Sequence, residues 1–203
     1  MSEQTKVQFD LSAINRVRRI SDRGHYDKET IFGIVDKALI AHVGFVEDGR
    51  PVVIPMTCAR VGESLLIHGA RKSRIMETVD GFPVCVTVTH VDALVYARSI
   101  FHSSMNYRSA VIHGTALPID DPEEKLAALE AMSEHLMPGR WSEVRAPLAK
   151  ELMATQVMRI ELILLPQRYA MLAFWMTAKT TRERNGQKPG QEFCRFAPRR
   201  ANR

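Results

Sequence analysis

Nine residues in the middle of the chain, Phe101 to Ser109, carry seven side chains that can form hydrogen bonds. They lead directly into Ala110-Val111-Ile112, an apolar run that predicts a buried strand. A polar cluster beside a buried strand loses hydration on folding unless a partner satisfies its hydrogen bonds. We therefore expect a ligand-binding loop here, although a solvated loop has the same composition.

A second polar cluster lies upstream, where a predicted strand at 65–68 passes into a predicted helix. Gly69 lets a ligand approach the backbone, and the start of a helix offers free N–H groups. Ser73 adds a hydroxyl, and Arg74 adds a guanidinium that can hold a phosphate through two hydrogen bonds. The pattern predicts an anion site, and the alternative is an ordinary basic surface.

The segments around these clusters predict a mainly β fold with flanking helices (α+β). Asp48-Gly49 between two apolar runs predicts a hairpin, and Asp121-Pro122 predicts the capped start of a helix. We expect strands at 41–46, 51–60, 65–68, 83–89, 94–97, 110–116 and 156–162, and helices at 31–40, 75–80, 121–137 and 145–154. Antiparallel strands in this order predict a closed or split β-barrel.

The net charge of +5 is concentrated at the C-terminus. Residues 166–203 hold nine Lys and Arg against two Asp and Glu, whereas residues 1–165 hold 19 against 21. Binding of nucleic acid would therefore depend on the tail alone, and we expect no such partner.

Other classes of protein are disfavoured by what the sequence lacks. No apolar run approaches the roughly 20 residues that span a bilayer, and the N-terminus has no apolar signal-peptide core. The three cysteines have neither disulfide nor metal-ligand spacing, and no two histidines lie at the i,i+4 spacing of a zinc-binding helix. We expect a cytoplasmic protein without a metal site and without a membrane partner.

Four motifs, taken in order, resemble the flavin-nucleotide-binding branch of the pyridoxamine 5′-phosphate oxidase-like family, to which nitroimidazole-resistance proteins are related. The motifs are Gly49-x-Pro51-Val52-Val53-Ile54-Pro55, Leu66-Ile67-His68-Gly69-x-x-x-Ser73-Arg74, Pro83-Val84-Cys85-Val86-Thr87-Val88-Thr89 and Phe101-His102-x-Ser104-Met105-Asn106-Tyr107-Arg108-Ser109. The resemblance covers about residues 16–163. It implies a split-barrel homodimer that binds FMN between its two subunits and oxidises or reduces a small molecule.

The resemblance also implies roles for individual residues. Ser73 and Arg74 would hold the FMN phosphate, with Arg108 and Ser109 approaching it from the strand after the polar cluster. The other implied contacts are the backbone of Val53, Ile54, Pro55 and Met56 along the ring edge, His68 and Gly69 beneath the ribityl chain, and Ser104 and Asn106 beside the flavin or a substrate. No residue stands out as a catalytic acid or base.

Two other functions stay open. A haem- or flavin-binding module without turnover would use His68 or His102 as its axial ligand. Nucleic-acid binding would have to use the basic tail.

We expect the chain to divide into an N-terminal arm at 1–24, an FMN-binding domain at 25–165 and an aberrant basic tail at 166–203. The family typically closes with a segment like Trp-Ala-Gly-Val-Leu-Pro-Leu, which this tail lacks. Shifted-frame codons over 165–180 and 189–197 can encode that ending, so we hypothesise a frameshift near residues 160–165, and the alternative is a divergent tail. A tail read out of frame would be poorly packed.

Overall fold

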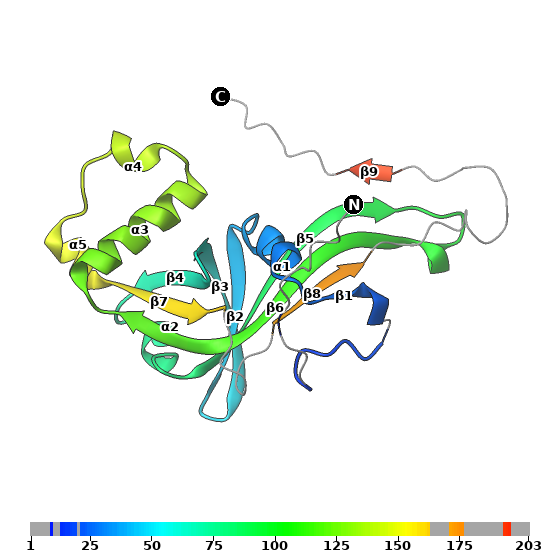
Figure 1. The fold of residues 1–203 in the computed structure, drawn as a ribbon, viewed down its shortest axis with the longest axis horizontal. Helices are drawn as coiled ribbons and strands as arrows, with labels where there is room; N and C mark the ends of the chain where they lie inside the picture. The colour runs from blue at the N-terminus through cyan, green and yellow to red at the C-terminus, as the bar shows by residue number, and fades with distance from the viewer. Residues whose placement is uncertain (1–8, 10–12, 20, 163–170, 177–192, 196–203) are drawn as a thin grey trace, which may run out of the picture.

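The computed structural model describes residues 9, 13–19, 21–162, 171–176 and 193–195. At its centre, six antiparallel strands close into a barrel, because β6 pairs with both β5 and β7 (Figure 1). In order around the barrel the strands are β5 (Pro83–Val95), β2 (Ile40–Glu47), β3 (Arg50–Val61), β4 (Ser64–Ala70), β7 (Thr155–Glu161) and β6 (Ser104–Ile119). The expected mainly β fold with flanking helices is confirmed.

Two tight turns set the register of β2, β3 and β4. Asp48 and Gly49 both have positive φ, 49° and 73°, as a two-residue hairpin turn requires. Gly62, with φ 58°, provides the positive φ of the tight turn between β3 and β4. The second turn places Val61 opposite Ser64, and counting back along the two strands places Thr57 opposite His68.

The barrel interior is filled by alternate residues of each strand and by α1 (Lys28–Val35). The Asp27 side chain caps α1 by accepting a hydrogen bond from the Thr30 N–H at 2.9 Å. Ile31, Ile34 and Val35 are at most 1% exposed. The helix is shorter than the predicted 31–40.

Helix α2 (Arg74–Thr78) packs Ile75 and Met76 into the same core. Gly69 precedes it at the end of β4, and a Cβ at this position would lie 3.1 Å from Cε of Met76. Glycine at 69 therefore lets α2 pack closely against the barrel.

Strands β5 and β6 continue past the barrel as a two-stranded arm (Figure 1). The expectation of a loop over all of 101–109 was wrong, because β6 already begins at Ser104 and β5 ends at Val95, and the connection between them includes a short 3-10 helix (η2, Ile100–His102). Pairing with β5 satisfies the backbone there, so polar side chains do not prevent a strand. The strand expected at 94–97 is the end of β5 after a bulge between Val91 and Ala93.

Short elements extend the sheet on the arm side. β8 (Met171–Met176) pairs with β6 and with β1 (Gly24–His25), which follows the 3-10 helix η1 (Ser21–Arg23). β9 (Phe193–Arg195) pairs with β5. The remainder of the expected 166–203 tail lies outside the described residues, so its packing and the frameshift stay predictions.

Three helices lie together on the side of the barrel away from the arm (Figure 1). They are α3 (Pro122–Leu136), α4 (Arg140–Glu143) and α5 (Ala149–Ala154). Asp121 caps α3 as predicted, accepting from the N–H groups of Glu123 and Glu124 at 3.0 and 2.8 Å. Within the described ranges, no helix is long and apolar enough to cross a bilayer.

Candidate functional site

Ser73 and Arg74, the predicted anion site, lie where β4 passes into α2. The Ser73 hydroxyl is buried, yet it has no hydrogen-bond partner among the described residues and does not cap α2. A buried polar atom without a partner is uncommon in folded proteins and is a place to look for a ligand. The Arg74 side chain is 61% exposed.

Glu47, at the end of β2, binds Arg74. The Arg74 Nε donates to Oε1 of Glu47 at 2.7 Å, and Nη2 donates to Oε2. The Thr78 hydroxyl lies 3.3 Å from Oε1 of Glu47 and 2.8 Å from the Arg74 carbonyl oxygen. These hydrogen bonds, chiefly the one from Arg74, lower the pKa of Glu47, so the carboxylate is ionised at neutral pH.

The backbone predicted to border the flavin ring lies on an open edge of β3. One edge of β3 pairs with β2 from Arg50 to Thr57, but the ladder with β4 begins only at Cys58. Among the described strands, the second edge of 50–57 therefore has backbone N–H and C=O groups outside any ladder. Val53 and Pro55 face outward, with Val53 63% exposed, whereas Ile54 and Met56 pack against the core.

His68 lies half-buried on β4, facing away from the barrel interior. Its Nδ1 is 3.2 Å from the Thr57 hydroxyl, and burial lowers its pKa, so the ring is neutral at pH 7. No described residue forms a hydrogen bond with Nε2. A neutral imidazole with one nitrogen held and the other free is a suitable ligand for a metal.

The remaining predicted residues lie on the arm. Ser104, Asn106 and Arg108 alternate along β6 and share one face, whereas Ser109 faces the other side and is 9% exposed. Arg108 binds Asp92 of β5 through both Nε, at 2.9 Å, and Nη2, at 2.6 Å. The structure therefore does not direct Arg108 and Ser109 toward one ligand.

The arm residues and the Arg74 cluster lie at opposite ends of β5. Gly44 pairs with Cys85, so Glu47 aligns with position 82, whereas Arg108 pairs with His90. Position 82, beside Glu47, and His90, beside Arg108, are eight residues apart along the chain. At about 3.3 Å per residue of strand, this is roughly 25 Å. Arg74 and Arg108 of one chain cannot share a phosphate.

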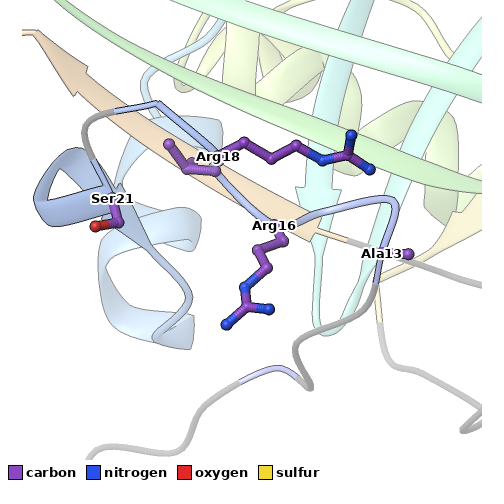
Figure 2. Close-up of a pocket in the computed structure, with 5 residues that line it drawn as sticks. Ala13, Arg16, Arg18 and Ser21 are labelled. Atoms are coloured by element: carbon purple, nitrogen blue, oxygen red, sulfur yellow. The ribbon is translucent and has the colours of Figure 1, made fainter.

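Two hollows on the surface of the described residues lie elsewhere. One, of about 500 Å³, is formed by the N-terminal segment, where the Arg16 and Arg18 side chains point in different directions (Figure 2). Another, of about 420 Å³, lies beside Trp141 and Met137. Neither is lined by a predicted site residue.

The described ranges contain no group of three His, Cys, Asp or Glu side chains arranged to hold a metal ion. Burial raises the pKa of the Cys58 thiol to about 11, so it stays protonated and unreactive at neutral pH.

Sequence reasoning missed three partners of predicted residues, namely Glu47, Thr57 and Asp92. Thr57 could have been found, because the turn at Gly62 fixes its position opposite His68. Glu47 could not, because its contact with Arg74 depends on where α2 packs.

Comparisons with known proteins agree with this fold. A model of the family described as pyridoxamine 5′-phosphate oxidase matches residues 27–168. The FAD and heme binding protein from Mycobacterium smegmatis has 31% identity and a TM-score of 0.74, covering 86% of this chain and 84% of that chain. The flavocytochrome Anf3 from Azotobacter vinelandii has 28% identity and a TM-score of 0.77, covering 94% and 91%.

A protein assigned to 5-nitroimidazole antibiotic resistance, from Bacteroides thetaiotaomicron, has 24% identity and a TM-score of 0.61. It covers 75% of this chain and 87% of that chain, and at this identity the likeness shows the fold alone. A search of curated proteins finds no match.

Proposed function

Because the chain belongs to the pyridoxamine 5′-phosphate oxidase family, we propose that it binds a flavin nucleotide through the phosphate, at Ser73 and Arg74. The observation that carries this proposal is the buried Ser73 hydroxyl, which lacks a partner beside an exposed guanidinium. The open edge of β3 adds backbone groups for the polar edge of the ring. FMN is the flavin that the motifs imply, whereas one similar structure is described as an FAD-binding protein.

We further propose that the flavin lies between two copies of the chain. Arg74 and Arg108 are too far apart in one chain to serve one site, but a homodimer can bring the arm of one copy to the barrel of the other. The outward face of β2 and β3 carries exposed apolar side chains, with Val46 66% and Val53 63% exposed. Such a face is suited to an interface between subunits.

The reaction class is oxidation or reduction of a small molecule. A bound flavin supplies the electron transfer, and the protein supplies binding, orientation and the charge around the ring. Ser104 and Asn106 of the partner's arm would contact the flavin or the substrate. A nicotinamide or a similar carrier is the proposed electron partner.

Titrating FMN and riboflavin into the Arg74→Ala variant tests the phosphate site. Loss of a charge-assisted hydrogen bond should weaken FMN binding about tenfold and leave riboflavin, which has no phosphate, unaffected. Arg71→Ala is the matched control, because it removes the same charge from an exposed position three residues away. Undiminished FMN affinity in Arg74→Ala would show that the phosphate binds elsewhere.

A second candidate function is haem binding, because two similar structures are described as a heme-binding protein and a flavocytochrome. Of the two histidines considered from the sequence, His68 is favoured, because it is half-buried and Thr57 holds its Nδ1. His102 is exposed at the tip of the arm, against the Phe101 ring. His90 and His135 are less suited, because their Nε2 atoms lie 2.9 and 2.8 Å from backbone carbonyl oxygens and leave only Nδ1 for the iron.

Reconstitution with haem tests the second candidate. His68→Ala should lose the Soret band of the bound haem, and His102→Ala should keep it. The reverse result would move the axial ligand to the arm, and no band in the unmodified protein would exclude haem.

A further inference from the structure

Arg74 offers Nε and Nη2 to Glu47, and these atoms form one of the donor pairs through which a guanidinium can bind a phosphate with two hydrogen bonds. We infer that Glu47 competes with the flavin phosphate for Arg74, so that the ion pair closes the site in the empty protein and opens as the flavin binds. This inference rests on the proposed flavin site and names the residue that regulates it.

The two partners differ in their freedom to move. The Glu47 side chain is 23% exposed and lies at the end of a paired strand, opposite Arg50. Thr78 also lies within hydrogen-bonding distance of its Oε1. The Arg74 side chain is 61% exposed. Arg74 is therefore the partner that can turn to a ligand, and Glu47 stays in place.

The charge beside the site opposes a second anion. Glu47 is ionised at neutral pH, and Asp48, the next residue, also acts on Arg74 through its charge. A phosphate that approaches Arg74 while Glu47 remains bound meets a carboxylate at close range, and like charges repel. If the phosphate replaces the Glu47 carboxylate on Arg74, the two anions do not have to bind the guanidinium together.

The Ser73 hydroxyl fits the same scheme. Glu47 satisfies Arg74 in the empty protein, but it leaves the adjacent Ser73 Oγ buried without a partner among the described residues. A phosphate has oxygens enough to accept from both residues, whereas Glu47 reaches only one. The Glu47 carboxylate therefore replaces only part of the contacts that the flavin phosphate would make.

The test compares FMN with riboflavin in four variants, Glu47→Gln, Asp48→Asn, Arg74→Ala and the Glu47→Gln/Arg74→Ala double variant. Glu47→Gln removes the competing charge, and FMN should bind roughly fivefold more tightly, the factor of a partly exposed ion pair. Riboflavin affinity should not change. Asp48→Asn removes a nearby charge but frees no donor of Arg74, so FMN affinity should change by less than about twofold. Asparagine also tolerates the positive φ at this turn position.

In the Arg74→Ala background, Glu47→Gln should tighten FMN binding by less than about twofold, the effect of removing a nearby charge alone, because the competition itself acts through Arg74. Unchanged or weaker FMN binding by Glu47→Gln, together with weaker binding by Arg74→Ala, would overturn the competition and make Glu47 a residue that orients Arg74. Unchanged binding by Arg74→Ala would instead reject the phosphate site itself. Thermal unfolding of each variant without flavin shows whether it is folded.

Discussion

The Thr57 hydroxyl of β3 lies 3.2 Å from Nδ1 of His68 on β4, one residue beyond the Cys58–Ile67 pair that ends the ladder between these strands. The contact fixes the orientation of the ring and, when Nδ1 donates the hydrogen bond, leaves the lone pair of Nε2 free. The contact also lies beside the open edge of β3, which ends at Cys58, where the ladder with β4 begins. His68 is thus held beside the backbone proposed to border the flavin.

Thr57→Val removes the hydroxyl while keeping the shape of the side chain. If His68 is the axial ligand of a haem, loss of this supporting hydrogen bond should weaken haem binding about tenfold. Thr89→Val, the same change at an exposed strand position, is the control and should have no effect. Equal haem affinity in Thr57→Val and the unmodified protein would contradict the role of Thr57.

Two histidines make stability depend on pH. Burial lowers the pKa of both His68 and His113 below the usual 6.5, so the unfolded chain binds protons more tightly than the folded one. Stability should therefore be full above about pH 7 and should fall as the pH drops toward about 5. Urea unfolding of the flavin-free protein across this range measures the loss.

The control for this prediction is the His68→Gln/His113→Gln double variant, which should lose less stability over the same pH range. An equally steep loss in that variant would assign the effect to other groups. Glu151, whose pKa is about 2 because Arg145 binds it, titrates below this range.

Val53→Asp places a charge on the outward face of β3, where the side chain is 63% exposed. An exposed position tolerates a charge in the monomer, but a buried interface does not. We expect the variant to be folded and monomeric and to lose flavin affinity, as measured by light scattering and flavin titration. Met153→Asp, on α5 at 65% exposure, should stay dimeric, and a dimeric Val53→Asp would place the interface elsewhere.

Arg60 of β3 forms an ion pair with Asp36, the residue that follows the last turn of α1. Its Nε and Nη2 donate to the Asp36 carboxylate at 2.6 and 2.8 Å, and its guanidinium lies 4.3 Å from the centre of the Phe32 ring. Arg60→Ala should lower the free energy of unfolding by about 1–2 kcal/mol. Arg60→Lys keeps the charge but not the planar fork, and it should recover only part of the loss. Full stability in Arg60→Ala would show that these contacts contribute little.

The local signals in the sequence predicted much of the barrel. The turn at Asp48-Gly49 needs positive φ, so it marks the hairpin of β2 and β3 and fixes which of their residues face each other. The cap at Asp121 marks the start of α3 because a side-chain oxygen there satisfies free N–H groups. Each of these features depends on residues that are close in the chain.

Features that depend on distant residues were not predicted. Polar side chains at 101–109 indicated a loop, because the sequence does not show that β5 is long enough to pair with them. The Arg74 to Glu47 ion pair joins residues 27 positions apart and exists only because α2 packs beside β2. The separation of Arg74 from Arg108 likewise follows from the register of the whole sheet.

The absorbance spectrum of the purified protein, recorded before and after reconstitution with FMN and with FAD, tests the central claim most directly. We predict the two flavin bands, in the near ultraviolet and the blue, together with quenching of free flavin fluorescence at one flavin per chain. A protein that shows neither band and binds neither flavin after reconstitution would contradict the claim that this chain is a flavin-nucleotide-binding protein.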